Sequence, residues 1–305
     1  MRSIRLFLPF LLVTLACSFT SPTPPTSSAP RPVPAVEASV TSVADSVSPA
    51  SSSGPMLYIS GTTHIESAPK SWPDPDAFLA FLQQVTDLGL RWSVGADVGW
   101  LEGEPRAAEV IQKSEAMGVQ WDVHTHAITD RAKAAYLITQ LGGHPDSVVS
   151  GMLVNELDAM RQPLTYQGYT WTPQVLWGGT NCPGHAPGCD DLAAGLWGPL
   201  SSDQYQVHDP NGTLIRVGGG THQLADGLAL VRSIADGQYD YPVISFTIMV
   251  APSTLRIVES ADGIEQIAAF VQQVKGYSFI RWATIEETAQ AWVEAGRVPS
   301  RIEMP

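Results

Sequence analysis

Short apolar runs alternate with longer segments of mixed polarity from residue 56 to the end of the chain. The runs lie between polar or glycine-rich stretches, which predicts strands. The longer segments carry apolar residues at helical spacing and several end at a glycine, as at Gly89 and Gly118, which predicts amphipathic helices. We expect strands at residues 56–62, 91–96, 119–123, 148–154, 214–217, 243–250 and 278–282, and helices at residues 76–88, 106–116, 132–141, 226–235, 263–274 and 285–295.

Regular alternation of strands and helices requires right-handed crossovers and a parallel sheet. The count of about seven strand–helix units predicts an α/β fold, a distorted (β/α)7-8 barrel over residues 55–300. A doubly wound open sheet is the alternative. Residues 157–212 are less regular and rich in Trp, Gly and Pro, so we expect a long irregular insertion there. The glycine run at 218–220 lacks the Lys-Ser/Thr ending of a phosphate loop and predicts a turn.

The first residues of the chain have the features of an export signal. Arg2 and Arg5 precede the apolar run 6–16, which has the length of a signal-peptide core and is short for a membrane span. The run ends in TLAC, which resembles a bacterial lipoprotein signal (residues 1–17) in which Cys17 becomes the lipidated first residue. Thr14 departs from that pattern, because a larger aliphatic residue is usual there. An ordinary secretory signal cleaved nearby is the alternative.

Residues 18–54 are rich in Ser, Pro, Thr, Ala and Val and contain almost no aromatic or charged residues. Such a segment cannot bury enough apolar surface to offset its chain entropy, so it predicts a disordered linker. We therefore expect an exported protein of the cell envelope, attached to the membrane through a lipid anchor only.

The charge balance is acidic. The 305 residues include 17 Lys and Arg against 30 Asp and Glu, which gives a formal net charge of −13. A chain of this composition cannot build a basic patch of useful size, which argues against nucleic acid or an anionic membrane surface as a partner.

The chain has three cysteines. If Cys17 is lipidated, Cys182 and Cys189 remain, close together in a Gly/Pro-rich loop. In an exported protein such a pair predicts a disulfide. A metal site built from Cys182, His185 and Cys189 is the alternative, although no further pair of cysteines completes a zinc site.

The third predicted strand ends in a run of chemistry-bearing residues. Asp122, His124 and His126 alternate with smaller side chains and would share one face of an extended chain. Burying such groups unpaired costs a few kcal/mol each, by the transfer scale for polar groups. A divalent cation removes that cost, because it takes imidazole nitrogens and carboxylate oxygens as ligands. Two exposed or hydrogen-bonded histidines at a strand end are the alternative.

Other predicted strands also end in polar residues. These are His64 and Glu66 after the first strand, Asp97 after the second, and Asn155 and Glu156 after the fourth. The carboxyl ends of barrel strands form the catalytic face of such folds, so these side chains are expected at one mouth. His64 with Glu66 and His124 with His126 are i, i+2 pairs, so each pair can point into this mouth.

The order of strands, helices and the VHTH sequence resembles the NodB-type polysaccharide deacetylases, carbohydrate esterases with a distorted (β/α)7 barrel. In that family a tandem Asp follows the first strand and His-Ser/Thr-x-x-x-His ends the third. One Asp is the general base, and the other Asp and both His bind a divalent metal. The match covers about the first half of the domain. Here His64-Ile65-Glu66 replaces the tandem Asp, the two histidines of the second motif are closer, and no Arg-Pro-Pro motif follows.

The resemblance implies a divalent metal ion, with zinc as the expected ion, held by His124, His126 and Glu66. Glu66 would take the place of the metal-binding Asp, and His64 would be an added ligand. The general base does not carry over, and Asp97 or Glu156 would have to supply it. The implied function is a metal-dependent hydrolase that removes N- or O-acetyl groups from carbohydrate. Five tryptophans lie in loops near the predicted mouth, and we expect them either to stack on sugar rings or to pack in the loops under the insertion: Trp72, Trp100, Trp171, Trp177 and Trp197. The residues expected to bind substrate are Trp100, Trp177 and His222, and His208 is expected at the same mouth.

Three other functions remain open. Asp122-Val123-His124-Thr125-His126 also resembles the opening motif of amidohydrolases and PHP-type phosphoesterases, although that motif belongs to their first strand. A glycoside hydrolase without metal would use two carboxylates such as Glu66 and Glu156. A non-catalytic, surface-tethered glycan-binding protein is the third alternative.

Overall fold

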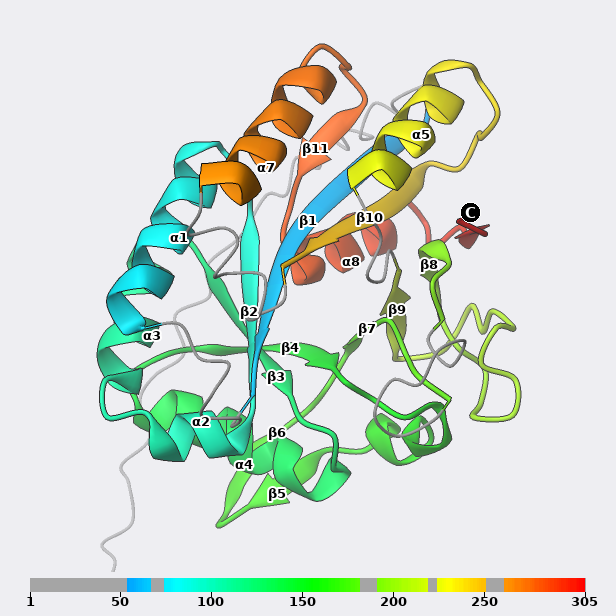
Figure 1. The fold of residues 1–305 in the computed structure, drawn as a ribbon. Helices are drawn as coiled ribbons and strands as arrows, with labels where there is room; N and C mark the ends of the chain where they lie inside the picture. Colours follow the sequence, from blue (N-terminus) through cyan, green and yellow to red (C-terminus); the bar gives the residue numbers. More distant parts are fainter. Residues whose placement is uncertain (1–53, 67–73, 182–190, 219–223, 251–260, 305) are drawn as a thin grey trace, which may run out of the picture. The chain divides into compact units, whose positions relative to one another are not determined.

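A computed structural model describes residues 54–66, 74–181, 191–218, 224–250 and 261–304 (Figure 1). Its main sheet has ten strands: β1 (Met56–Ile65), β2 (Trp92–Ala96), β3 (Gln120–His124), β4 (Pro145–Ser150), β7 (Val175–Trp177), β8 (Ala194–Trp197), β9 (Ile215–Val217), β10 (Val243–Met249), β11 (Ile280–Trp282) and β12 (Ser300–Ile302). A separate hairpin pairs β5 (Leu164–Tyr166) with β6 (Tyr169–Trp171). The described helices are α1 (Pro75–Asp87), α2 (Val98–Gly103), α3 (Ala107–Ala116), α4 (Ile128–Gln140), α5 (Leu224–Ala235), α7 (Ala261–Val274) and α8 (Ile285–Glu294), with short 3-10 turns at Val154–Glu156 and Ala159–Arg161.

The strands lie in the order β10-β1-β2-β3-β4-β7-β9-β8-β12, and β11 also pairs with β1. The pairings from β10 through β9 are parallel, whereas β8 runs antiparallel to both β9 and β12. The two ends of the curved sheet meet through side chains. Ser245 Oγ on β10 donates to the carbonyl of Gly195 on β8 at 3.0 Å, and Ser300 Oγ on β12 donates to the carbonyl of Val243 at 2.8 Å. The predicted distorted α/β barrel is therefore confirmed.

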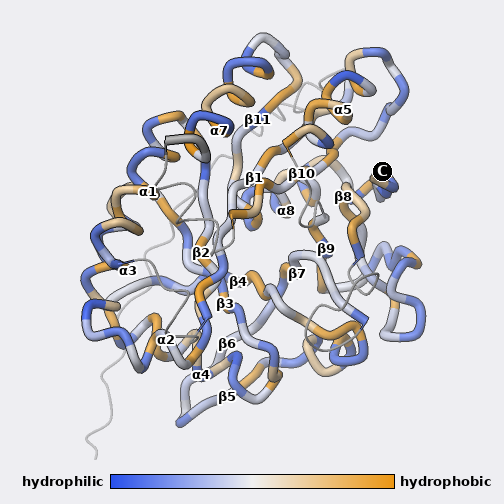
Figure 2. Tube along the Cα trace, in the orientation of Figure 1, coloured by the Kyte–Doolittle hydropathy of each residue, from blue (hydrophilic) through white to orange (hydrophobic). Residues whose placement is uncertain are grey.

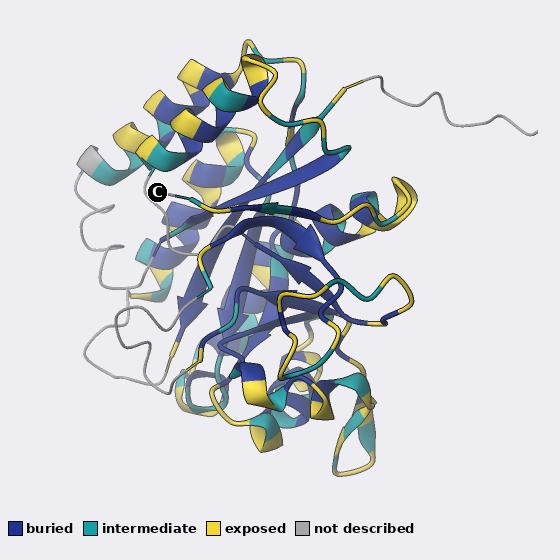
Figure 3. Cartoon of the chain, turned by 90° about the vertical axis from the view of Figure 1, so that its right-hand side faces the viewer, coloured by how far each residue is buried: buried dark blue, intermediate teal, exposed yellow. Residues whose placement is uncertain are grey.

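Alternate residues of β1 face two different layers. Leu57 and Ile59 belong to the apolar core that also contains the buried faces of α1, α3, α4, α5 and α7. Tyr58 packs against the second core, and the hydroxyl of Ser60 lies 3.3 Å from that of Thr288 on α8. Burial of each large apolar side chain stabilises the fold by roughly 1.5–3 kcal/mol. Figures 2 and 3 show the result: apolar, buried strands inside helices whose outer faces are polar and exposed.

Helix α8 packs on the inner face of the sheet, in contrast to the outer helices. Ile285 and Trp292 of this helix join the core formed by inward-facing strand residues such as Val148. Its first turn lies at the amino end of β2, because Arg91, the residue before that strand, pairs with Glu287 at 2.5 Å. The helix therefore fills the interior of the barrel from the amino ends of the strands (Figure 1).

Local sequence explains where the helices begin and end. The Asp74 carboxylate caps α1 by accepting from the backbone N–H of Asp76 at 2.8 Å, and Pro75 takes the first helical position, where no N–H is needed. Gly89 follows the end of α1 with a φ of 82°, a left-handed conformation that suits glycine. Thr284 caps α8 in the same way, with Glu287 completing the capping box.

Two predictions about the elements were wrong. The segment that contains Trp100 was expected to be a loop but forms α2, because the Asp97 side chain caps it through the N–H of Trp100 at 2.7 Å. Strand β4 ends at Ser150 rather than at residue 154, because Gly151 adopts a φ of 75°. The region 157–212, expected to be a long irregular insertion, also contributes the short strands β7 and β8 to the main sheet.

The chain divides into two units, Met1–Pro49 and Ala50–Pro305. The predicted signal at 1–17 with Cys17, and the predicted linker up to residue 53, lie outside the described residues. Within the described ranges, every helix is too short or too polar to cross a membrane. The predicted Cys182–Cys189 disulfide also falls outside these ranges.

Candidate functional site

Glu66 meets two histidines at the carboxyl rim of the barrel. Glu66 follows β1 directly, while His124 ends β3 and His126 lies two residues beyond it. Oε1 of Glu66 lies 2.9 Å from Nε2 of His124 and 3.3 Å from Nε2 of His126. One ligand atom from each residue lies within 4.8 Å of the other two. The structure thus brings together three of the four residues expected to bind a metal.

The fourth residue, His64, lies below this group inside the barrel. It is buried, and its ring stacks on that of His124 with centroids 4.0 Å apart and planes 23° apart. The rings of His64 and Trp177 meet in a T-shaped arrangement, with centroids 5.0 Å apart. His64 is outside the group of ligand atoms that the described residues bring within 4.8 Å of one another. In this geometry His64 supports the ring of His124.

Buried neighbours fix the orientation of His124. Its Nδ1 lies 2.9 Å from Oγ of Ser150 at the end of β4, and both side chains are almost completely buried. Gly95 on β2 provides the space for the ring, because a Cβ there would lie 2.9 Å from His124 Cβ and 2.9 Å from His64 Cδ2. A Cβ at Gly151 would lie 3.0 Å from His124 Cε1. These contacts direct Nε2 of His124 toward Glu66.

The site is half open to solvent. The side chain of His124 is 2% exposed, whereas those of His126 and Glu66 are 45% and 49% exposed. Hydrogen bonds from His124 and His126 hold the pKa of the Glu66 carboxyl far below its usual value. The hydrogen bond with Glu66 raises the pKa of His126. The carboxylate is therefore ionised at neutral pH and accessible beside two imidazoles.

The donor set fits a divalent transition metal. Two imidazole nitrogens and one carboxylate oxygen are the three protein ligands of many catalytic zinc sites, which keep a further position for water or substrate. Nε2 of both histidines already faces the same carboxylate oxygen. If a cation replaced the Nε2–H protons of His124 and His126, the Glu66 oxygen would still face a positive charge. These three residues therefore suit such an ion.

The two predicted catalytic acids are linked to the rim in different ways. Asp97 directly follows β2, and its charge raises the pKa of His126. The charge of Arg131, the partner of Glu156, lowers that pKa. Oδ1 of Asp97 accepts from the N–H of Trp100. Oε2 of Glu156 accepts from Nη2 of the buried Arg131 at 2.6 Å. Each acid therefore combines a structural contact with a position close to the rim.

The predicted substrate-binding tryptophans lie in the core, contrary to expectation. Trp100 is 4% exposed and stacks on Trp121 with ring centroids 5.5 Å apart, so neither face is available to a sugar. Trp177 is 7% exposed and donates from Nε1 to Oγ1 of Thr247 at 3.0 Å. Both are buried because α2 and β7 form where loops were expected. Trp171 and Trp197 are buried as well.

Two further histidines were expected at the mouth. His208 instead packs against Trp292 of α8, with ring centroids 5.8 Å apart, and its Nδ1 accepts from the N–H of Gly198 at 3.1 Å. His222, like Trp72, lies outside the described residues. Asp122 points to the inner face as expected, but its carboxyl contacts Asp146 instead of joining the rim group.

Sequence reasoning missed Ser150, Arg131 and Gly95. Ser150 is a small polar residue directly before a glycine, which is a signal for a strand end. Arg131 is a charged residue on the buried face of α4, and an arginine at an apolar position of a helix indicates a buried ion pair. No sequence signal distinguishes Gly95 from a glycine that merely interrupts a strand.

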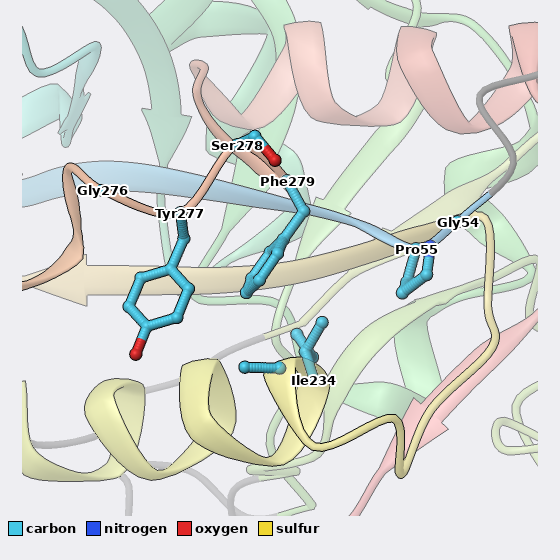
Figure 4. Close-up of a pocket in the computed structure, with 8 residues that line it drawn as sticks. Gly54, Pro55, Ile234, Gly276, Tyr277, Ser278 and Phe279 are labelled. Atoms are coloured by element: carbon cyan, nitrogen blue, oxygen red, sulfur yellow. The ribbon is translucent and has the colours of Figure 1, made fainter.

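A hollow of about 400 Å³ lies away from this site, at the start of β1. Tyr277 and Phe279 point into it toward α5, with Ile234 opposite and Pro55 beside them (Figure 4). The Tyr277 phenol is the one ionisable side chain among the residues that line it. This hollow therefore offers apolar contacts rather than catalytic groups. Glu66 lies at the opposite end of β1.

The fold is similar to those of solved structures. A candidate glycoside hydrolase/deacetylase from Parabacteroides distasonis is 12% identical, and the match covers 79% of this chain and 72% of that one with a TM-score of 0.51. Candidate polysaccharide deacetylases from Pseudomonas aeruginosa PAO1 and Mycobacterium smegmatis are 12% and 10% identical and cover 78% and 83% of this chain, and 91% and 95% of theirs, each with a TM-score of 0.49. No protein-family model and no curated protein matches the sequence. The resemblance to deacetylases is thus confirmed at the level of the fold, by the first of these structures.

Proposed function

We propose that this protein is a metal-dependent hydrolase of the polysaccharide deacetylase type, which removes acetyl groups from a carbohydrate. The observation that carries the proposal is the convergence of Glu66, His124 and His126 within 4.8 Å at the carboxyl rim. The barrel shared with the Parabacteroides distasonis protein, described as a candidate glycoside hydrolase/deacetylase, supports it. The metal, with zinc as the expected ion, would be held by these three residues.

A bound metal would polarise the acyl carbonyl and increase the acidity of the attacking water. The chain's own residues supply the remaining functions. The contact with Ser150 holds the His124 ring in place, and Glu66 balances the charge of the ion. A carboxylate near His126 would accept the proton of the attacking water, as a general base does. The products are acetate and a free amine or hydroxyl on the sugar.

Asp97 is the general base that we favour. Glu156 is committed to an ion pair with Arg131, whose side chain is fully buried. Removal of that carboxylate from the pair would leave an uncompensated buried cation, which is costly. The charge of Asp97 acts on His126, and its side chain also caps α2. We assign Glu156 to positioning Arg131.

We extend the proposal to the cell envelope. The TLAC sequence at residues 14–17 supports lipidation at Cys17, and the Ser/Pro-rich segment that follows would tether the catalytic domain. Detection of a lipid on Cys17 by mass spectrometry of the membrane fraction tests this part. Recovery of the protein without a lipid, in the soluble fraction, contradicts it.

The experiment that tests the enzymatic proposal combines metal analysis with an acetate-release assay on acetylated chito-oligosaccharides and O-acetylated xylan. We expect about one equivalent of zinc, activity that a chelator abolishes, and loss of both in His124→Ala. The matched control is His144→Ala, because His144 is exposed and pairs with Glu115 elsewhere. A protein that binds no metal contradicts the proposal. Chelator-resistant cleavage of glycosidic bonds would favour the glycoside hydrolase, and unchanged glycan binding in a His124→Ala, His126→Ala variant would favour the binding protein.

A further inference from the structure

A second set of acceptor oxygens lies inside the barrel, below the rim. Asp122 precedes His124 by two residues on β3, so both side chains face inward. The Asp122 side chain is 0% exposed, and neither of its carboxylate oxygens receives a hydrogen bond from a donor. Its carboxyl lies within hydrogen-bonding reach of that of Asp146. Two carboxyl groups in contact, one of them fully buried, are stable only with a proton or a cation between them.

An irregularity in the sheet brings Asp146 to this position. Strands β3 and β4 pair from Trp121 with Pro145 and resume at Val123 with Val149, so the register shifts between them. Asp146 lies in the shifted stretch. Its Oδ1 accepts from the N–H of Val148 at 2.9 Å, whereas its Oδ2 is buried and receives no hydrogen bond. The bulge therefore directs one acceptor oxygen of Asp146 toward the interior.

A third unsatisfied oxygen lies on the same face of β3, and a cavity opens beside it. Oε1 of Gln120, two residues before Asp122 on the same strand face, is buried and receives no hydrogen bond. Gln120 and Asp146 both line a cavity of about 390 Å³, together with Glu286, Glu115 and His144. Water and ions can therefore reach two residues, Gln120 and Asp146, that carry buried oxygens without donors.

We propose that Asp122, Asp146 and Gln120 bind a hard divalent cation such as Ca²⁺ or Mg²⁺, with water in the cavity completing its coordination. Carboxylate and amide oxygens are the ligands that these ions take, and Mg²⁺ in particular is held by one or two carboxylates plus water. The site differs in chemistry from the rim, where imidazole nitrogens favour zinc. The cation would clamp β3 against β4 two residues below His124.

The surrounding charges favour a cation. Glu286 adds negative charge close to both aspartates, and its Oε1 accepts from the N–H and hydroxyl of Ser147. Glu115 is paired with the exposed His144 at 3.0 Å. The positive Arg91 nearby is paired with Glu287. With only two charged ligands, we expect a weak site, with a Kd of about 0.1–1 mM.

Terbium luminescence tests the proposal, because Tb³⁺ occupies calcium sites and is sensitised by nearby indoles. Trp171 is such an indole, since its Nε1 donates to the backbone carbonyl of Asp146 at 2.9 Å. On the full chain we expect tryptophan-sensitised luminescence that millimolar Ca²⁺ displaces. Asp122→Asn and Asp146→Asn should each weaken Tb³⁺ binding at least tenfold. The matched controls, the exposed Asp203→Asn and the rim variant His126→Ala, should bind as the unmodified protein does.

Thermal unfolding keeps the proposal testable if an aspartate variant fails to fold. In chelator-treated protein, addition of 10 mM Ca²⁺ should raise Tm by about 3–8 °C, as expected for a ligand at 10–100 times its Kd. The His126→Ala variant should show the same rise, which separates this site from the rim. Absence of both sensitised luminescence and a Tm shift with Ca²⁺ or Mg²⁺ overturns the proposal and leaves a proton shared between the two carboxyls. Equal Tb³⁺ binding by the aspartate variants overturns it as well.

Discussion

Oγ of Ser150 and Nδ1 of His124 lie 2.9 Å apart, and both side chains are buried. A metal-binding histidine generally donates the N–H of its other ring nitrogen to an acceptor, which fixes the tautomer and the direction of the ligand nitrogen. Here the hydroxyl at the end of β4 can accept that hydrogen bond. The contact thus joins the ends of β3 and β4 to the proposed chemistry at the rim.

We expect Ser150→Ala to weaken zinc binding by about 10–100-fold, the usual effect of removing such a partner. The cause is a His124 ring that no longer has a fixed tautomer and orientation. Competition with a chromophoric chelator measures the affinity. Ser60→Ala is the matched control, because Ser60 is an equally buried serine that bonds to Thr288 on α8. Equal affinities in the two variants would contradict the role given to Ser150.

The ion pair between Glu66 and His126 predicts how metal binding depends on pH. In the metal-free protein, NMR titration should give His126 a pKa above the ordinary histidine value of about 6.5, because the hydrogen bond with Glu66 favours the protonated ring. Because the pKa is raised, the ion pair stabilises the fold fully at pH values below the ordinary histidine pKa. This stabilisation is lost as the pH rises through the raised pKa. Protons and metal compete for the ring, so zinc affinity should rise over the same pH interval.

Glu66→Gln is the informative variant for this titration. The pKa of His126 should fall, because the neutral amide no longer favours the imidazolium. The charge of Asp97 remains beside the ring, so part of the upward shift should persist. A His126 pKa that is the same in both proteins would show that the contact between Glu66 and His126 is absent in solution.

The Asp97→Asn variant separates the proposed role of Asp97 as general base from its role as the cap of α2. Asn caps helices about as well as Asp, so the contact with the N–H of Trp100 should survive and Tm should change little. Loss of the basic carboxylate should lower kcat by about 10²–10⁴-fold with KM nearly unchanged. Steady-state acetate release measures this. Full activity in Asp97→Asn would exclude Asp97 as the base.

Glu156→Gln provides the contrasting result. Removal of the carboxylate leaves the buried Arg131 without its ion-pair partner, which should lower the free energy of unfolding by about 3–5 kcal/mol. Urea unfolding measures this loss. If instead Glu156→Gln is as stable as the unmodified protein and loses activity, the base is Glu156 and our assignment of the two acids is reversed.

Gly95→Ala should disturb the site while leaving all three metal ligands in the sequence. Its Cβ would lie 2.9 Å from atoms of both His124 and His64, so the two stacked rings would have to move. Such overpacking costs about 1–3 kcal/mol, and zinc affinity should fall with the displaced ring. Gly103→Ala is the control, because a Cβ there meets no atom within 4 Å. An unchanged affinity in Gly95→Ala would show that the rings adapt.

Periodicity and strand ends were enough to predict much of the fold and part of the site. Glu66, His124 and His126 meet because they follow parallel strands whose carboxyl ends share one rim, and alternation along a strand is visible in sequence. The inward position of His64 also follows from alternation. His64 lies below the three clustered ligands because Glu66, two residues later, is already past the end of β1. The alternation within the strand does not predict that difference.

Other features depend on local irregularities that no pattern of apolar residues reveals. The role of Ser150 depends on a strand that stops at Gly151, and the pattern of apolar residues continued beyond it. The contact between Asp122 and Asp146 depends on a register shift between two strands. Trp100 was expected on a loop, and its burial follows from a cap by Asp97 that creates α2.

The position of α8 has a consequence for how the chain reaches its native state. The ribosome makes this helix after every strand that surrounds it except β12. Until it emerges, inward-facing residues such as Val148, Trp177 and Val217 have no helix to pack against. A nascent chain that stops before Thr284 would present these side chains to chaperones or to other chains, so productive closure must await nearly complete translation.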